Sequence, residues 1–132
     1  MQARLTDKHF KVFKEEVSYW QKKLFLGIWR IDFTFKRDIT CRAWFSYNIP
    51  GMTVNLCLSS IWNNTPQKEV TDYLIRRTAF HETVEVFLCK LADCSSWSRE
   101  VTEQATHEII RSLESSIFIE DYERRFKKEK VK

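Results

Sequence analysis

Two histidines and two glutamates in the second half of the chain have the types and spacing of a metal site. His81, Glu82 and Glu85 lie close together, and His107 follows further along. In a helix, positions 81 and 85 are one turn apart on the same face, so both side chains could bind one metal ion. Glu82 lies about 100° round the helix, near enough to reach a water at that ion. The spacing is that of the H-E-x-x-H zinc motif, with Glu85 replacing the second histidine.

These side chains would supply the donor set of a catalytic zinc. Such a site has three protein ligands and keeps one position for water. We expect His81, Glu85 and His107 to be the ligands. Glu103, one turn before His107, is a rival third ligand, or a partner that orients His107 through its other ring nitrogen. Glu82 would be the general base, taking a proton from the water and delivering it to the leaving amine.

Two long helices must position these residues. The stretch 65–94 predicts one helix, with Thr65 as N-cap and Pro66 at the first helical position. Ser98 is a plausible cap for a final helix that continues to residue 118. The apolar stripe expected on this final helix consists of Val101, Ala105, Ile109, Leu113 and Ile117.

The first half of the chain predicts a helix and a small sheet. Apolar spacing indicates a helix over 7–25, with His9 near its start in an exposed or capping role. Alternating polar and apolar residues then predict strands over 28–36, 39–49 and 52–62. Short connections favour an antiparallel meander. The fold class is therefore α+β: an N-terminal helix, a three-stranded antiparallel sheet and two long helices. Within the third strand, the segment TVNLCLS is the expected edge for an extended peptide.

Composition favours one compact domain over 1–123, followed by a basic tail at 124–132. The tail holds six basic residues and one acidic residue, and a solvated tail is favoured over a nucleic-acid contact. No apolar run approaches the roughly 20 residues of a membrane span, and the N-terminus lacks the apolar core of a signal peptide. We therefore expect a cytoplasmic protein without a membrane partner. Buried, reduced thiols are expected at Cys41, Cys57, Cys89 and Cys94.

Four segments together carry a resemblance to a known family: WRIDF at 29–33, the strand ending at Trp62, RRTAFHETVEVFLCKL at 76–91 and VTEQATHEIIRSLES at 101–115. Over roughly residues 24–118, the layout resembles a minimal zincin-type metallopeptidase, similar to small phage and prophage proteins of the SprT-like kind. The resemblance implies zinc-dependent hydrolysis of peptide bonds in a peptide or protein substrate and, for a phage-encoded protein, a place in the host cytoplasm.

The motif departs from the family pattern at one ligand. Gluzincins combine H-E-x-x-H with a later glutamate, whereas this chain has H-E-x-x-E and a later histidine. The ligand types are unchanged, but two positions are exchanged. The resemblance therefore carries the ligand role over to His81 and the base role to Glu82, with Glu85 and His107 completing the set.

Two other interpretations stay open. Glu85 could simply pair with Arg77 or Lys90, and His107 could be a hydrogen-bonded histidine between helices. In function, the chain could be a catalytically inactive, phage-encoded interaction protein that inhibits a host enzyme or defence complex. Exposed Trp44 and Arg42 on the second strand would favour that interpretation.

Overall fold

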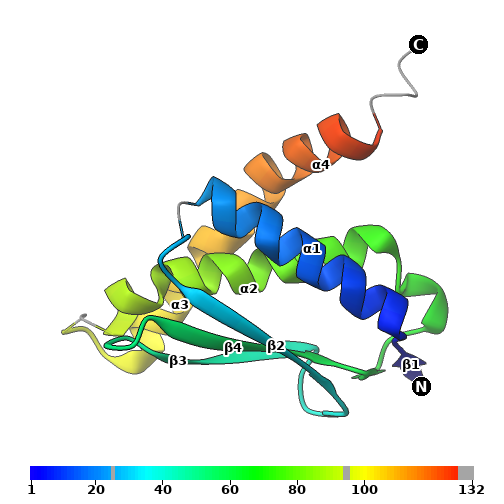
Figure 1. The fold of residues 1–132 in the computed structure, drawn as a ribbon, viewed down its shortest axis with the longest axis horizontal. Coiled ribbons are helices and arrows are strands. Elements are labelled where there is room, and N and C mark those ends of the chain that lie inside the picture. The colour runs from blue at the N-terminus through cyan, green and yellow to red at the C-terminus, as the bar shows by residue number, and fades with distance from the viewer. Residues whose placement is uncertain (25, 94–95, 128–132) are drawn as a thin grey trace. The chain divides into compact units, whose positions relative to one another are not determined.

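The computed structural model describes residues 1–24, 26–93 and 96–127, with residues 90–92 described by their backbone alone (Figure 1). The fold is α+β. The chain divides into two compact units, Met1–Phe87 and Leu88–Lys132. The division falls within helix α2 (Asp72–Asp93), so this helix contributes residues to both units.

Helix α1 (Asp7–Lys23) begins where the apolar spacing predicts, and Phe25 lies outside the described residues. Thr6 is its N-cap and forms a capping box with His9. The His9 Nδ1 atom accepts a hydrogen bond from the Thr6 backbone N–H at 2.9 Å. This bond satisfies a backbone donor that no helical carbonyl can reach. The capping role expected for His9 is confirmed.

The main sheet contains β2 (Arg30–Lys36), β3 (Ala43–Asn48) and β4 (Thr53–Ser59) in the order β2-β4-β3. β4 pairs antiparallel with β3 but parallel with β2. The sheet is mixed, so the predicted antiparallel meander is wrong. The turn at Asn48–Gly51 closes the β3–β4 hairpin as expected, and the Asn48 side chain accepts the Gly51 N–H at 2.8 Å. β2 then occupies the other edge of β4 rather than an edge of β3.

The central position of β4 also corrects the predicted peptide-binding edge. A strand paired on both sides has no free backbone groups for a peptide, so the TVNLCLS segment is not an edge. The burial of β4 also indicates a central strand, since four consecutive residues are buried: Leu56, Cys57, Leu58 and Ser59. Continuous burial of this kind is typical of a central strand. Among the described strands of this sheet, the edges are β2 and β3.

A second, two-stranded sheet joins the N-terminus to the end of the strand region. β1 (Gln2–Arg4) pairs antiparallel with β5 (Ile61–Asn63), which places Ala3 opposite Trp62. Both of these residues are fully buried. The alternation of only three residues is too short to predict β1, and the sequence pattern had merged β5 into the preceding strand.

Within the Met1–Phe87 unit, α1 and the first part of α2 lie on the same side of the main sheet (Figure 1). The Phe10 and Phe35 rings stack at 4.9 Å between centroids, which joins α1 to β2. The Trp20 and Phe80 rings meet edge-on at 4.6 Å, which joins α1 to α2. Each large side chain buried here contributes about 1.5–3 kcal/mol to folding. The core of this unit therefore holds α2 in place from its first turns.

α2 begins later than the sequence predicts, after a short 3₁₀ turn, η1 (Gln67–Glu69). Thr65 is not its N-cap. The Thr65 side chain is buried and accepts a hydrogen bond from Arg42 at 3.1 Å. Thr71 caps the helix instead, because its hydroxyl accepts the Leu74 N–H at 3.2 Å. Cys94, the predicted end of the helix, lies outside the described residues.

The second unit continues with α3 (Arg99–Leu113), a π-helical turn η2 (Glu114–Phe118) and α4 (Ile119–Phe126). Ser98 caps α3 as predicted, and its hydroxyl accepts the Val101 N–H at 3.3 Å. The predicted apolar stripe is wrong, because the buried residues lie on a different face of the helix. Val101 and Ile117 are half exposed, whereas Ile110, Phe118 and Tyr122 are buried. The Phe118 and Tyr122 rings pack together at 5.9 Å, and this aromatic contact favours the other face of the helix.

The thiols follow the sequence prediction in part. Cys57 and Cys89 are buried thiols outside any disulfide, whereas the Cys41 thiol, also outside any disulfide, is only half-buried. In the described part of the chain, no helix combines the length and apolar character that a bilayer crossing requires.

Candidate metal centre

α2 carries three of the four predicted site residues in its middle. The helix is fixed on its buried face by Ile75, Ala79 and Val86. His81 and Glu85 are half-buried, and Glu82, next to His81 in sequence, is only 7% exposed. The side chains are thus presented by a helix that packing already immobilises, as a preorganised site requires.

His81 and Glu85 lie one turn apart and contact each other. The distance from His81 Nε2 to Glu85 Oε1 is 3.3 Å. Tetrahedral zinc with bonds of about 2.0–2.1 Å separates neighbouring ligand atoms by about 3.3 Å. The two atoms already have the separation of two zinc ligands. Both side chains come from neighbouring turns of one helix, which keeps them close together. His81 is thus a partner of Glu85 on this helix, as the metal-site interpretation requires.

Glu82 has a strongly shifted pKa. Burial, followed by the neighbouring Glu85 carboxylate, raises the pKa of Glu82 from 4.5 to about 8, and His81 acts in the opposite direction. The Glu82 Oε2 atom is buried without a hydrogen-bond partner. A buried polar atom without a partner destabilises a fold by about 1–3 kcal/mol. Such an atom beside a histidine and a second carboxylate suggests a site built for a cation or a water.

Helix α3 supplies His107, and a hydrogen bond within the helix places a proton on one of its ring nitrogens. His107 Nδ1 lies 2.9 Å from the backbone oxygen of Glu103. A carbonyl oxygen can only accept a hydrogen bond, so Nδ1 must carry the proton. Nε2 is then the nitrogen that can bind a metal. The Glu103 carboxylate is engaged elsewhere, with Arg99 at 3.1 Å. Glu103 thus orients His107 through its backbone, a contact that side-chain patterns do not reveal.

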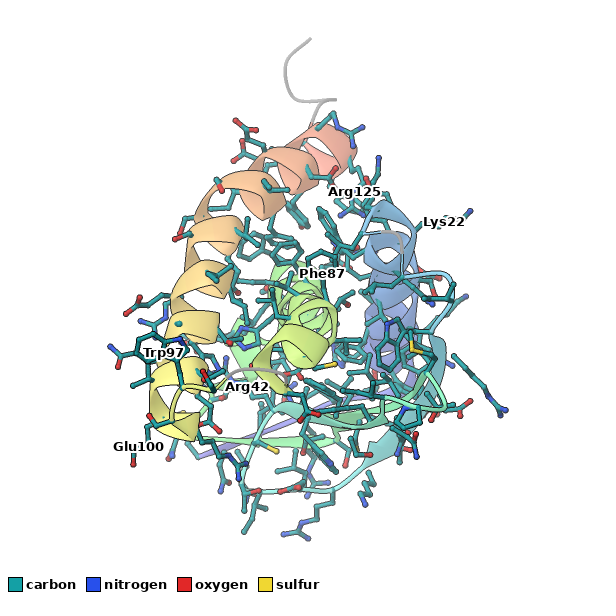
Figure 2. The ribbon with its side chains drawn as sticks, turned by 90° about the vertical axis from the view of Figure 1, so that its left-hand side faces the viewer. Lys22, Arg42, Phe87, Trp97, Glu100 and Arg125 are labelled. Carbon is teal, nitrogen blue, oxygen red and sulfur yellow. The ribbon has the colours of Figure 1, made fainter. Side chains whose placement is uncertain are left out.

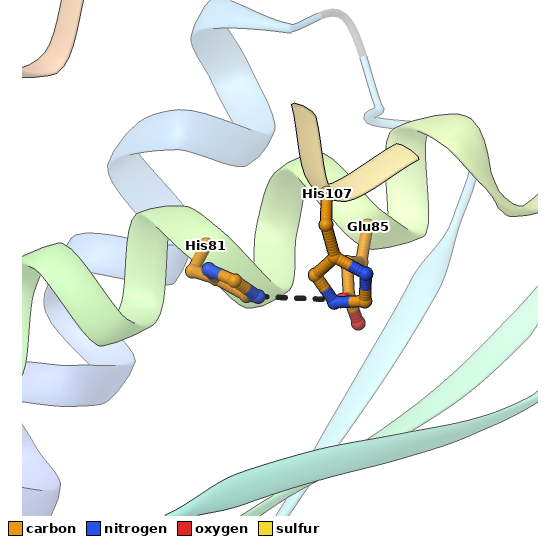
Figure 3. A group of neighbouring side chains, drawn as sticks. All are labelled: His81, Glu85 and His107. Atoms are coloured by element: carbon orange, nitrogen blue, oxygen red, sulfur yellow. Dashed lines mark ion pairs between the residues drawn. The ribbon is translucent and has the colours of Figure 1, made fainter. Parts of the chain in front are cut away.

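His81, Glu85 and His107 form a group that could hold a metal ion, because one ligand atom from each lies within 4.8 Å of the others (Figure 3). The donor chemistry fits zinc, which binds imidazole nitrogen and carboxylate oxygen. The three residues are the ones that the H-E-x-x-E spacing and the later histidine predict. Glu82 is the buried carboxylate next to them in sequence.

The thiol of Cys41, before β3, has a raised pKa. Burial raises this pKa, a hydrogen bond with Thr40 lowers it, and the charges of Asp38 and then Glu82 raise it. Cys41 belongs to no metal-ligand spacing in the sequence.

No protein-family profile, curated protein or solved structure matches this chain. The resemblance to zincin-type metallopeptidases therefore stays a hypothesis that rests on residue pattern alone.

Proposed function

We propose that the protein is a zinc-dependent hydrolase that cleaves peptide bonds, with His81, Glu85 and His107 as metal ligands and Glu82 as general base. The observation that carries the proposal is the Glu82 carboxylate, buried without a partner for Oε2 beside the ligand group. An ordinary structural glutamate in such a place would be paired. A catalytic carboxylate needs a free oxygen that can accept a proton from water.

Zinc held by these ligands would supply a Lewis acid that polarises the scissile carbonyl and makes a nearby water more acidic. Glu82 accepts a proton from the water as its oxygen attacks the carbonyl carbon. Glu82 then passes this proton to the leaving nitrogen, so that the carbon–nitrogen bond breaks to give an acid and an amine. A neighbouring cation favours the charged carboxylate and lowers its pKa. Glu82 would therefore be an unprotonated base near neutral pH.

The sheet offers a place for an extended substrate, but not the one first expected. β4 is paired on both sides, whereas β3 is an edge strand. β3 belongs to the same compact unit as Glu82, the proposed base. An extended peptide that pairs with the outer edge of β3 would gain main-chain hydrogen bonds there.

Metal content is the first test. We expect about one zinc per chain in the purified protein by elemental analysis. His81→Ala and His107→Ala should each lose the metal. His9→Gln is the matched control, since His9 is the third histidine of the chain and caps α1. Glutamine suits the same capping position. Zinc that is retained in both alanine variants would contradict the ligand assignment.

Hydrolysis separates the role of the base from the roles of the ligands. Glu82→Gln keeps the shape of the side chain but cannot take a proton, so it should bind zinc and lose about 10²–10⁴-fold in kcat. Fluorogenic peptides of mixed sequence provide the assay. A Glu82→Gln variant as active as wild type would contradict the base assignment. Zinc binding without any peptide cleavage in wild type would instead favour an interaction protein that uses a metal for structure.

A further inference from the structure

We propose that a hollow on the polar face of the main sheet binds a sugar. Phe33 of β2 packs against Phe13 of α1, so the next residue on either side of Phe33 points to the opposite face. Figure 2 shows side chains projecting from the sheet on this side, away from α1. The hollow has a volume of about 230 Å³, and its lining includes five polar residues: Asp32, Ser46, Asn48, Thr53 and Asn55.

The strand register brings these five side chains together. Asn55 of β4 lies opposite both Asp32 of β2 and Ser46 of β3. Two residues nearer to the β3–β4 hairpin, Thr53 lies opposite Asn48. Residues that lie opposite each other point to the same face, and neighbouring strands are about 4.7–4.9 Å apart. One ligand of modest size could therefore contact side chains from all three strands.

Hydrogen bonds within the fold orient both asparagine side chains. Asn48 Oδ1 accepts the Gly51 N–H at 2.8 Å, and Asn55 Oδ1 accepts the Thr34 hydroxyl at 3.1 Å. Both amide oxygens are thus engaged. Each amide nitrogen keeps two N–H donors that bond to no other described residue. Because the side chains are already oriented, a ligand that binds them costs less conformational entropy.

The Asp32 carboxylate places hydrogen-bond acceptors beside these donors. Its side chain is 58% exposed, and its contact with Arg30 Nε is long, at 3.4 Å. The hydroxyl groups of Ser46 and Thr53 can both donate and accept. The hollow therefore offers donors and acceptors together, with one negative charge that Arg30 partly offsets.

This combination of groups favours a neutral ligand that carries several hydroxyl groups. An ammonium or guanidinium group only donates hydrogen bonds, so it could not use the amide donors of the asparagines. A phosphate or carboxylate group accepts hydrogen bonds, but the Asp32 carboxylate would repel its charge. A hydroxyl group donates and accepts, so neighbouring hydroxyls of one sugar ring could bind the carboxylate and the amides together. The occupant is therefore a sugar, either free or at the end of a glycan.

Binding should be weak, because each polar group exchanges a hydrogen bond with water for one with the ligand. We expect a Kd of about 1–10 mM, and titration of the ¹⁵N-labelled chain to about 100 mM sugar covers this range. The probes are D-glucose, D-galactose, D-mannose and N-acetyl-D-glucosamine. With at least one of them, the side-chain amide signals of Asn48 and Asn55 in the ¹H–¹⁵N spectrum should move to saturation. Maltose, which ends in a glucose unit, distinguishes a glycan terminus from free D-glucose, and saturable binding of either supports the proposal.

Two substitutions on this face test the assignment. Asp32→Val removes the acceptors and Asn55→Val removes an amide donor, and each should weaken sugar binding about tenfold. Valine suits a strand, so both variants should keep the fold, which their spectra also report. Lys36→Val is the control. Lys36 is an exposed residue on the same face of β2 as Asp32, but it lies outside the hollow, and its substitution should leave sugar binding unchanged.

Three results would each overturn the proposal. The first is the absence of saturable movement with every sugar. The second is equal sugar binding by wild type, Asp32→Val and Asn55→Val, which would place the sugar elsewhere. Agmatine, which carries a guanidinium group, and inorganic phosphate test charged occupants, and tighter binding of either one than of any sugar is the third. None of these measurements depends on zinc or on peptide hydrolysis, so the sugar site and the proposed hydrolase can fail separately.

Discussion

Two buried glutamates in the Met1–Phe87 unit show how a side chain's partners distinguish structure from chemistry. Glu16 is fully buried and accepts hydrogen bonds from Trp20 Nε1 at 2.7 Å and from Arg76 Nη1 at 2.9 Å. Glu82 is nearly as buried, but its Oε2 has no partner. Paired burial makes Glu16 part of the joint between α1 and α2. The unpaired oxygen of Glu82 does not stabilise the fold as the hydrogen bonds of Glu16 do, which supports a role for Glu82 in binding or catalysis.

Removal of the Arg76 charge should destabilise the fold strongly. Arg76→Met leaves Glu16 buried without its cation, and we expect a loss of about 3 kcal/mol in the free energy of unfolding, measured in urea. Replacing Glu16 as well, in Glu16→Leu/Arg76→Met, should recover part of the loss. Arg30→Met removes an exposed pair with Asp32 and is the control, with a loss below about 1 kcal/mol. Equal losses at the buried and exposed pairs would contradict this account.

The raised pKa of Glu82 predicts a pH dependence for the metal-free chain. The folded state holds this proton up to about pH 8, whereas the ordinary pKa is 4.5. The folded state therefore binds more protons between these values, and stability falls as the pH rises through them. Glu82→Gln is neutral at every pH, so its stability should not fall in this way. Above the pKa of about 8, its free energy of unfolding should exceed that of wild type by a few kcal/mol.

Urea unfolding in a chelating buffer at about pH 5 and about pH 8.5 measures this difference. At the lower pH, wild type and Glu82→Gln should have similar stability. Glu15→Gln changes an exposed glutamate of α1 and serves as the control. If Glu82→Gln and wild type changed in parallel with pH, the buried carboxylate would not be the source of the dependence.

At the level of the elements, local sequence signals predict where helices begin, but they do not predict the order of the strands in the sheet. Ser98 and His9 act through neighbours three residues away, and both caps follow from the sequence. Thr65 has the right residue type for a cap, but a tertiary hydrogen bond from Arg42 engages its side chain. The pairing of β2 with β4 is a contact between segments separated by a whole strand. Alternation fixes which face a residue occupies, but it carries no information about which neighbour a strand selects.

Helix geometry explains why the contact between His81 and Glu85 was easier to predict than the order of the strands. The spacing of His81 and Glu85 brings both side chains to one face of the helix, within reach of the 3.3 Å contact that they make. The contact of His107 Nδ1 with the Glu103 carbonyl is also local, because the two residues are one turn apart in α3. It involves a backbone oxygen, however, so the periodicity of side-chain types does not specify it.

The β3–β4 hairpin contains a strained position that can be tested. Met52 has φ 51°, in the left-handed region, and its N–H donates to the Ile49 carbonyl at 3.1 Å. This conformation costs a residue with a side chain about 1–2 kcal/mol, and glycine avoids the cost. Met52→Gly should raise the free energy of unfolding by about 0.5–1 kcal/mol in thermal or urea unfolding, after the larger chain entropy of glycine is included.

Asn64 provides the matched control for the hairpin. It has φ 54°, but asparagine tolerates this region, so Asn64→Gly should give no gain. A loss of stability in Met52→Gly would show that packing of the half-buried Met52 side chain outweighs the relief of backbone strain.

For the whole molecule, ion pairs engage part of the basic charge near the C-terminus. The net charge is +4, and much of the excess lies at the C-terminus. The basic tail begins within α4, where Arg124 and Arg125 both pair with Asp121, at 2.7 Å and 2.6 Å. Residues 128–132 lie outside the described part of the chain. These ion pairs reduce the charge that the tail can offer to phosphates.

Zinc should stabilise the whole chain if its ligand set exists only in the folded state. A ligand that binds only the folded protein adds about 2.7 kcal/mol at a concentration 100 times its Kd. We therefore expect zinc to raise the midpoint of thermal unfolding and a chelator to reverse the rise. Magnesium should have little effect, because it prefers octahedral oxygen ligands over imidazole. His81→Ala and His107→Ala should each abolish the response, whereas His9→Gln should keep it. A zinc response of equal size in all three variants would show that the metal binds elsewhere, and the proposed centre would then be wrong.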